Sequence, residues 1–302
     1  MGFFDLQVNG YQGVDFCSAS LQAEDVRRAC EALRADGIEQ ILATVITDSV
    51  EAIERKLANL VRIREDDEFI ASVIAGFHVE GPFISPKLGF VGAHPAEEVC
   101  EATEDRAKRI LEAGSGLVRL VTLAPEQDAK ARTTKFLVAE GVTVSAGHCD
   151  PSLEVLERSI DAGLSMVTHL GNGCPVDLPR HDNIIQRCLS LSERLWICFI
   201  PDGVHVPFFA LRNYLRLVGV DRVIVTTDAI MAAGLGPGRY ELSGVPVEID
   251  ENGVARRPGS ENLAGSTIRG MQVAENLSRE LGLSRSEIQA CFHDHPRSAL
   301  RI

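Results

Sequence analysis

The chain has 302 residues, of which 45% are hydrophobic and 24% charged, as is ordinary for a soluble globular protein. Its formal net charge of −13 argues against a general nucleic-acid binder and against docking on an anionic membrane. A small anionic substrate is still compatible with this charge, because a few local arginines or histidines can outweigh the distant field.

The cysteines and the N-terminal sequence indicate a cellular compartment. The eight cysteines never form a C-x-x-C pair and mostly lie in apolar stretches, which is typical of reduced, buried thiols. The start of the chain has no signal-peptide pattern, and there is no uninterrupted apolar run of about 18 residues. We therefore expect a soluble cytoplasmic protein.

Strand-like runs alternate with helix-like runs along the whole chain. The expected strands cover 3–8, 39–46, 69–80, 116–123, 141–148, 163–169, 195–200 and 221–228. The expected helices cover 20–36, 49–65, about 103–113, about 127–140, a helix opened by Asp150-Pro151 with Asp150 as N-cap, and 206–219.

Eight strands separated by helices predict a (β/α)8 TIM barrel, with an open doubly wound sheet as the alternative. Residues 240–259 interrupt the alternation with two short runs around Asn252-Gly253, which predicts a β-hairpin inserted after the eighth strand. The last barrel helix is expected to begin near 264–266. With no linker or internal repeat, residues 1–302 are predicted to form a single domain.

Four of the expected strands end in a polar residue of the kind that binds metals or moves protons. These residues are Glu80, His148, His169 and Asp228. In a parallel barrel such strand ends face one common mouth, which favours a metal-dependent hydrolase. Two imidazoles and a carboxylate can hold a divalent ion that acidifies bound water, and a separate aspartate can carry the proton.

Some choices among neighbouring residues stay open from the pattern alone. His78 and Glu80 are two residues apart in one strand and face the same way, so either is a candidate ligand. His94 and His205 lie in loops at the same face and are candidate contacts to substrate oxygen. The pair His293 and His295 has metal-like spacing but lies away from the strand ends, which favours a structural role.

A set of motifs extends over nearly the whole sequence. These segments are DLQVNGYQGVDF (5–16), GFHVEGPFISPKLGFVGAHP (76–95), VTLAPE (121–126), SAGHCD (145–150), THLGNGCP (168–175), PDGVHV (201–206), VTTDAI (225–230) and LAGST (263–267). Together they resemble the N-acetylglucosamine-6-phosphate deacetylase family of the amidohydrolase superfamily. They follow the family's order, so the resemblance is specific.

The resemblance implies one divalent metal ion held by Glu80, His148 and His169, with Asp228 as general base and acid. Zinc is the expected ion, and iron, cobalt and manganese suit the same ligands. Many superfamily members carry H-x-H on the first strand for a second metal. Here these positions are Gln7 and Asn9, which resemble the Q-x-N pattern of some family members and imply a vacant second position.

The resemblance also implies the residues that contact the substrate. His94 and His205 are expected to touch the sugar, and Asn172 and Gly173 to lie near a sugar phosphate. Arg180 is similar to an arginine that the family lends across a dimer, so a homodimer is expected.

Two further departures from the family pattern bear on these expectations. The small β-sandwich that the family builds from both termini is absent from the pattern, so another element, such as a partner subunit, would cover the barrel bottom or side. The segment 169–174, HLGNGC, replaces a family sequence similar to HLFNAM, and we expect its glycines to enlarge or loosen the pocket.

The leading hypothesis is metal-dependent deacetylation of an N-acetylated amino sugar, with N-acetylglucosamine 6-phosphate giving glucosamine 6-phosphate and acetate. The first alternative is a related amide hydrolase acting on a different or unphosphorylated N-acyl sugar, or on a cyclic amide. The second is a non-catalytic metal- or sugar-binding homologue. The complete ligand set and Asp228 argue against the second, because a binder has no need of a general base.

Overall fold

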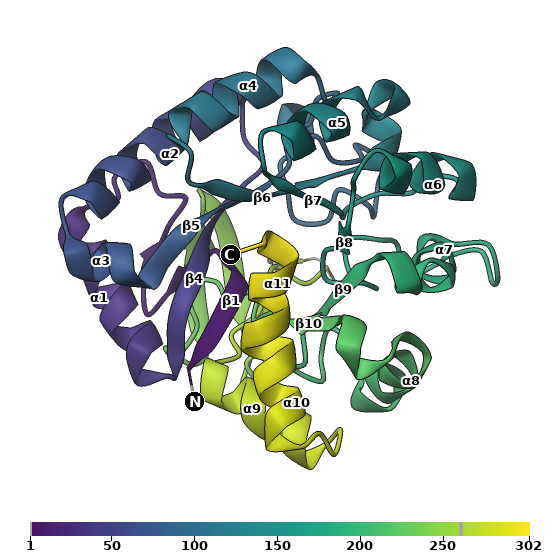
Figure 1. Cartoon of the computed structure of the whole chain (residues 1–302). Coiled ribbons are helices and arrows are strands. Elements are labelled where there is room, and N and C mark those ends of the chain that lie inside the picture. Colours follow the sequence, from purple (N-terminus) through teal and green to yellow (C-terminus); the bar gives the residue numbers. More distant parts are fainter. Residues whose placement is uncertain (1, 260–261) are drawn as a thin grey trace.

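Eight parallel strands form a barrel in which each strand hydrogen-bonds to the next one along the chain, as the (β/α)8 prediction requires (Figure 1). The computed structural model describes residues 2–259 and 262–302. The barrel strands are β1 (Phe3–Val8), β4 (Ile38–Ile46), β5 (Ile74–Glu80), β6 (Val118–Leu123), β7 (Thr143–Ala146), β8 (Met166–Val167), β9 (Trp196–Phe199) and β10 (Val223–Val225).

Most helices pack around the outside of this barrel (Figure 1). They are α1 (Ala23–Ala35), α2 (Val50–Glu65), α3 (Glu68–Val73), α4 (Glu104–Ala113), α5 (Arg132–Ala139), α6 (Leu153–Asp161), α7 (Ile184–Ser190), α8 (Phe208–Val218), α9 (Gly270–Arg279), α10 (Arg285–Gln289) and α11 (His295–Leu300). Helix α1 buries one stripe, from Val26 through Cys30 to Leu33, as its spacing predicts. In the part of the chain that the structure describes, no helix combines the length and the apolar character needed to cross a membrane.

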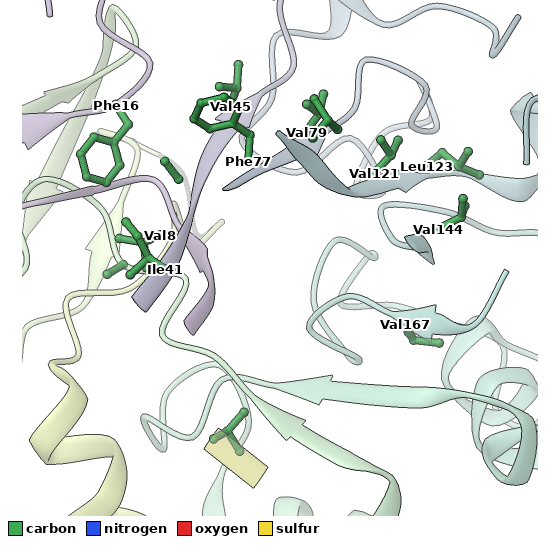
Figure 2. Close-up of a cluster of buried hydrophobic side chains, with 14 of the residues drawn as sticks. Val8, Phe16, Ile41, Val45, Phe77, Val79, Val121, Leu123, Val144 and Val167 are labelled. Carbon is green, nitrogen blue, oxygen red and sulfur yellow. The ribbon is translucent and has the colours of Figure 1, made fainter. Parts of the chain in front are cut away.

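Two apolar layers result from the alternation of side chains along the strands. The outer layer fills the space between strands and helices and includes Val45, Val79 and Val144 (Figure 2). The inner layer fills the barrel itself with Phe4, Leu6, Leu42, Leu120, Met166, Cys198 and Ile224. The polar site therefore rests on a packed interior and not on an open pore.

The bottom of the barrel is covered by the chain itself. Ala299 and Leu300 of α11 belong to the inner apolar cluster. The Thr143 hydroxyl at the start of β7 donates to the Ala299 carbonyl over 3.0 Å, and His295 Nδ1 donates to the Val223 carbonyl at the start of β10 over 2.8 Å. The element that covers the bottom in place of a β-sandwich is therefore α11, and His295 has the predicted structural role.

The seam between β10 and β1 is closed without a regular ladder. The backbone contributes the Asn9 amide, which donates to the Ala229 carbonyl over 2.7 Å. Below it, the buried Asp5 carboxylate accepts from the Thr226 hydroxyl at 2.5 Å, from the Thr227 amide at 3.1 Å and from the Gln7 amide at 3.1 Å. One carboxylate thus connects the first and last strands of the barrel.

A small antiparallel sheet follows β10 at the position of the predicted hairpin. It has three strands, β11 (Gly238–Leu242), β12 (Val245–Ile249) and β13 (Ala255–Arg256). The two-residue turn is Ser243-Gly244, and Asn252-Gly253 lies in the longer turn that follows β12. Outside the barrel, the described residues add only this sheet and the β2 (Gly10–Tyr11) and β3 (Val14–Asp15) pair, and they build no β-sandwich.

Several predicted boundaries were wrong for local physical reasons. Residues 69–73 of the expected third strand belong to helix α3, because Asp67 caps that helix through the amides of Phe69 and Ile70. Helix α6 is capped by Ser152 and not by Asp150. Helix α9 begins at Gly270, after the 264–266 segment has paired with β13 and the loop after β10. Helix α7 was not predicted.

We predict that Asp5 makes stability depend on pH. Burial raises the pKa of Asp5 from 3.8 to about 6. A carboxyl whose pKa is raised by folding binds more protons in the folded state than in the unfolded state. The contribution of Asp5 to the unfolding free energy is therefore complete below pH 3.8 and is lost as the pH rises through about 6. Between pH 4 and pH 7 the wild type should lose on the order of 3 kcal/mol of unfolding free energy relative to Asp5→Asn.

Urea denaturation of both proteins across this pH range measures the difference. Asp105→Asn, at an exposed position in the first turn of α4, is the matched control and should follow the wild type. Parallel curves for the wild type and Asp5→Asn would contradict the prediction.

Candidate metal centre

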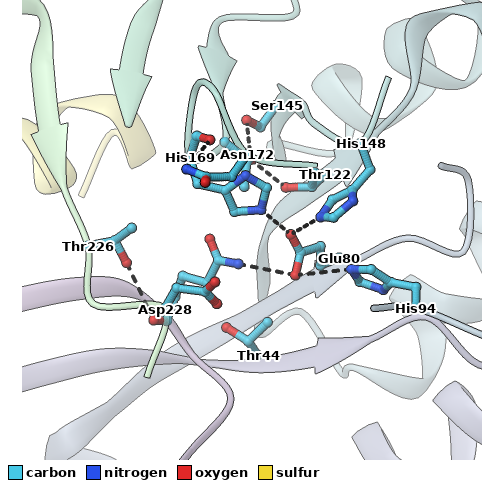
Figure 3. Close-up of polar contacts among 12 residues, drawn as sticks. Thr44, Glu80, His94, Thr122, Ser145, His148, His169, Asn172, Thr226 and Asp228 are labelled. Carbon is cyan, nitrogen blue, oxygen red and sulfur yellow. Dashed lines mark hydrogen bonds and ion pairs between the residues drawn. The ribbon is translucent and has the colours of Figure 1, made fainter. Parts of the chain in front are cut away.

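Glu80, His148 and His169 converge at the mouth of the barrel, as the strand ends predicted (Figure 3). Glu80 is the last residue of β5, and the two histidines follow β7 and β8. His169 Nε2 lies 2.8 Å and His148 Nε2 lies 3.3 Å from Glu80 Oε1. One potential ligand atom from each residue lies within 4.8 Å of the other two, and all three residues are buried.

A hydrogen bond to the Phe90 carbonyl determines which ring nitrogen of His148 faces the cluster. His148 Nδ1 lies 2.9 Å from the Phe90 carbonyl oxygen, which can only accept, so Nδ1 carries the proton. Nε2 is then the nitrogen directed at Glu80 Oε1. A divalent cation between the two satisfies both, and a histidine held by a carbonyl at its far nitrogen is a common metal ligand. The donor set therefore fits a metal ion.

The buried Glu80 carboxylate is a negative charge that needs positively charged partners. Burial acts to raise the pKa of the Glu80 carboxyl, but hydrogen bonds from His148 and His169 outweigh it and hold the pKa well below its usual range. The pKa of His169 is raised, because the Glu80 carboxylate outweighs the effect of burial. A metal ion would take the place of the imidazolium charge that Glu80 attracts.

His78, the other candidate in β5, is committed elsewhere. Its Nε2 lies 2.7 Å from the Thr122 hydroxyl, which continues through Thr168 to Ser145 at 2.7 and 2.6 Å. This chain of hydrogen bonds connects β5, β6 and β7 with Thr168, directly after β8. Burial lowers the pKa of His78 to about 4, so the ring is neutral. The geometry groups Glu80, and not His78, with the two histidines.

The side-chain amides of Gln7, in β1, and of Asn9, just after β1, hold the carboxylates of the site. Gln7 Nε2 donates to Glu80 Oε2 over 3.1 Å, and Asn9 Nδ2 donates to Asp228 Oδ1 over 2.7 Å. Asp228 follows β10 directly across the seam from Asn9. Burial and the Glu80 charge raise the pKa of Asp228 to about 6, a value suited to a group that takes up and releases a proton near neutrality.

Three residues of the site have left-handed backbone, which the sequence pattern did not reveal. The φ angles of His148, His169 and Asp228 are 50°, 32° and 50°. Such conformations cost about 1–3 kcal/mol each in residues other than glycine, and they concentrate at functional sites. Each follows its strand by two or three residues, at the corner where the chain turns outward.

A cavity of about 610 Å³ opens above the cluster. Of the residues proposed from the sequence, Glu80, His148, His169, Asp228, Asn9, His94, His205, Asn172 and Gly173 line it. Gln7 lies behind Glu80. Arg180 is exposed on the 171–182 loop and is not among the lining residues.

His205 is held by a residue that sequence reasoning missed. Its Nδ1 lies 2.7 Å from Asp202 Oδ2, and its backbone amide donates to Asp202 Oδ1 over 2.8 Å. An aspartate three residues before a loop histidine was the available signal. Because Nδ1 is engaged, Nε2 is the nitrogen left for the cavity.

The glycines of the 171–174 loop were expected to enlarge or loosen the pocket, but Gly173 does not do so. A Cβ on Gly173 would lie 2.7 Å from His148 Nδ1, so only glycine allows the loop to pack against this ring. A Cβ on Gly171 would meet nothing within 4 Å. The loop is therefore tight over His148 at Gly173 and open at Gly171.

Comparison with known proteins gives the family. No protein-family model matches the chain. The chain is 33% identical over 311 residues to N-acetylglucosamine-6-phosphate deacetylase of Bos taurus, covering 100% of this chain and 74% of that protein. The chain belongs to the N-acetylglucosamine-6-phosphate deacetylase family. It is also 32% identical over 286 residues to N-acetylgalactosamine-6-phosphate deacetylase of Shewanella sp. (strain ANA-3), covering 94% of this chain and 70% of that protein.

Solved structures of this family superpose on the whole chain. A mutant N-acetyl-D-glucosamine-6-phosphate deacetylase from Mycobacterium smegmatis, in complex with N-acetyl-D-glucosamine-6-phosphate, is 31% identical with a TM-score of 0.90. The alignment covers 100% of this chain and 77% of that one. The enzyme from Thermotoga maritima is 26% identical with a TM-score of 0.88, covering 99% and 78%.

We predict that a divalent metal stabilises the folded chain through Glu80. At a zinc concentration about 100 times the dissociation constant, the melting temperature of the metal-free wild type should rise by roughly 5 °C or more. Glu80→Gln should lose this rise, because a neutral amide is a poor ligand beside two imidazoles.

Differential scanning calorimetry with and without zinc, together with metal analysis, measures the effect. His293→Gln is the control, since His293 belongs to the other histidine pair and contacts Asp294. An equal rise in the wild type and Glu80→Gln would rule out the proposed site.

Proposed function

We propose that the chain hydrolyses the acetamide group of an N-acetylated amino sugar, with N-acetylglucosamine 6-phosphate as the leading substrate. The observation that carries the proposal is the convergence of Glu80, His148, His169 and Asp228 on one cavity, in a chain of this family. The products are glucosamine 6-phosphate and acetate.

One metal ion is part of the proposal, with Glu80, His148 and His169 as its ligands and zinc as the expected ion. Iron, cobalt or manganese would suit the same donors. When bound, a divalent ion supplies Lewis acidity, which polarises an amide carbonyl and acidifies water. The proposal of a single ion is supported by Gln7 and Asn9, whose amide groups donate to the site's two carboxylates at the family's second-metal position.

Asp228 is proposed to carry the proton through both halves of the reaction. Its carboxylate takes a proton from the attacking water as the new C–O bond forms, and it then delivers this proton to the amide nitrogen as the C–N bond breaks. The raised pKa of Asp228 supports this role, because the group must be a base in the first half and an acid in the second.

The remaining cavity residues are proposed to hold the sugar. His94 and His205 line the cavity, and Asp202 fixes the tautomer of His205. Asn172 and Gly173 are proposed to contact the sugar phosphate. The Asn172 side chain donates to the His169 carbonyl over 3.1 Å, which links this loop to the metal ligand.

The identity of the hexosamine has a second candidate. A relative that is 32% identical to the chain is an N-acetylgalactosamine-6-phosphate deacetylase, a similarity close to that of the N-acetylglucosamine-6-phosphate enzymes. An unphosphorylated N-acyl sugar and a cyclic amide remain the alternatives of different chemistry. Acetate release from both acetylhexosamines, with and without the 6-phosphate, and amide opening of a cyclic amide distinguish them.

We further propose a homodimer in which Arg180 reaches the partner's cavity. In support, Arg180 is exposed and lies outside the cavity of its own chain, although its loop contributes several residues to the mouth. A cytoplasmic location is proposed from the thiols, since all eight cysteines are free. Residues 1–302 are proposed to act as one domain built on the barrel.

We predict that Asp228→Asn lowers kcat for acetate release by about 100- to 10,000-fold, because the general base and acid is lost. Asparagine tolerates the left-handed backbone at this position and can keep the hydrogen bond from Asn9. The bound metal should therefore remain at the wild-type level. Acetate release and metal analysis on the same samples test this, and near-full activity in the variant would refute the role of Asp228.

We predict that two impaired variants complement each other in a mixed dimer that shares Arg180. Arg180→Ala should raise KM selectively for phosphorylated sugars, by about tenfold or more. Hybrid dimers with Asp228→Asn chains then contain one site with both native residues, so an equal mixture should recover about a quarter of wild-type activity per chain. Coexpression followed by kinetics checks this. Activity equal to the average of the two variants would show that the arginine is not shared.

A further inference from the structure

The charges that line the cavity are unbalanced. Five acidic residues line it: Asp48, Glu80, Glu97, Glu98 and Asp228. Against them, among residues 2–259 and 262–302, stands one arginine or lysine, Arg257. Sequence reasoning had pointed to Arg180 as the cation for an anionic substrate and had given Arg257 no role.

Two of the acids have partners that offset their charge. Asp48 Oδ2 accepts from Lys56 Nζ at 2.8 Å, and Glu80 is the carboxylate of the candidate metal site. Glu97, Glu98 and Asp228 remain. An anionic group on a substrate would therefore be repelled over much of the cavity wall, and Arg257 marks the part of the wall where it would be attracted.

The pairing of the small sheet explains why Arg257 faces the cavity and its neighbour Arg256 does not. Ala255 pairs with Ile249 of β12, and its carbonyl accepts from the Ala264 amide at 3.1 Å, so β13 is held on both sides. Side chains alternate along a strand. Ala255 is buried in the cluster beneath the sheet, Arg256 points away and contacts Asp250, and Arg257 returns to the side of Ala255.

The guanidinium of Arg257 is not committed to the protein. Within the part of the chain that the structure describes, it forms no hydrogen bond or ion pair, and the residue is partly exposed. An arginine carries five N–H donors in a planar fork that matches the oxygens of a phosphate. Such a group, held by a sheet at the wall of a catalytic cavity, is suited to bind an anionic substituent of the substrate.

We propose that Arg257 binds the phosphate of the amino sugar within its own chain and thereby selects phosphorylated over neutral substrates. The inference rests on the proposed deacetylase function, and it adds a specificity residue that lies outside the metal site and outside the 171–182 loop. The phosphate would contact Arg257 while the acetamide group lies at Glu80, His148 and His169. Arg257 is a binding residue in this proposal and takes no part in the proton transfers.

The test measures binding of glucosamine 6-phosphate, which has no acetamide to hydrolyse, so the result does not depend on turnover. Isothermal titration of the metal-loaded full chain compares this ligand with glucosamine. Arg257→Met should weaken binding of the phosphorylated sugar by about 10- to 100-fold, as expected for the loss of a charge-assisted bidentate contact. Arg257→Lys, which keeps the charge without the fork, should give a smaller loss.

Arg256→Met is the matched control, because it removes the neighbouring arginine on the opposite side of β13. It should bind both sugars as the wild type does, and the melting temperatures of all variants should be close to that of the wild type. Equal affinity of Arg257→Met and wild type for glucosamine 6-phosphate would overturn the proposal. So would a wild type that binds glucosamine 6-phosphate no more tightly than glucosamine.

A kinetic experiment separates this proposal from the proposed function. With active wild type, Arg257→Met should lower kcat/KM for the acetylated 6-phosphate through KM, with kcat nearly unchanged and the unphosphorylated sugar unaffected. Absence of acetate release by the wild type would refute the deacetylase function, while the binding measurements would still decide whether Arg257 holds the anion.

Discussion

Closure of the barrel between β10 and β1 is the constraint on which the site depends. The ladder is missing there, and the buried Asp5 carboxylate joins the two strands through Thr226, Thr227 and Gln7. Asn9, two residues after Gln7, meets Asp228, two residues after Thr226. The same first strand sends Gln7 to Glu80. A shift of the seam by one residue would turn these side chains to the other face, so one buried carboxylate determines how Asp228 lies relative to Glu80.

The packed barrel also offsets the strain of the site that it carries. Left-handed backbone at His148, His169 and Asp228 costs roughly 3–9 kcal/mol in total, which is comparable to the whole net stability of a typical domain, about 5–15 kcal/mol. This conformation persists because the strands below are fixed by two apolar layers and by the bottom cover of α11. This conformation turns each side chain inward at the point where the chain leaves its strand. Gly173 completes the arrangement, because only a residue without a Cβ can lie against His148.

The hydrophobic periodicity of the sequence predicted the regular elements of this molecule. Predictions failed where a single contact determines the local structure. Apolar runs ending in Glu80, His148, His169 and Asp228 predicted the barrel and the meeting of these four residues. The run 69–80 was assigned wholly to a strand because a short buried helix has the same apolar content, and the Asp67 cap decided the outcome. Ser152 displaced Asp150 as a cap for a similarly local reason. The Asp5 seam, the backbone strain and the direction of Arg257 depend on contacts between distant segments, which no local pattern encodes.

The proposed chemistry and the proposed recognition of the substrate lie on different parts of the structure. Glu80 ends β5. His148, His169 and Asp228 follow β7, β8 and β10 within three residues, where a change of backbone would disturb the common core. Arg257 directly follows β13 of the small sheet, whose apolar residues, such as Leu242 and Val247, form a cluster of their own with Ile230 of the loop after β10. With Arg257 as the proposed phosphate contact, a substitution at the edge of this sheet would alter which substituent the cavity accepts without displacing Glu80 or Asp228.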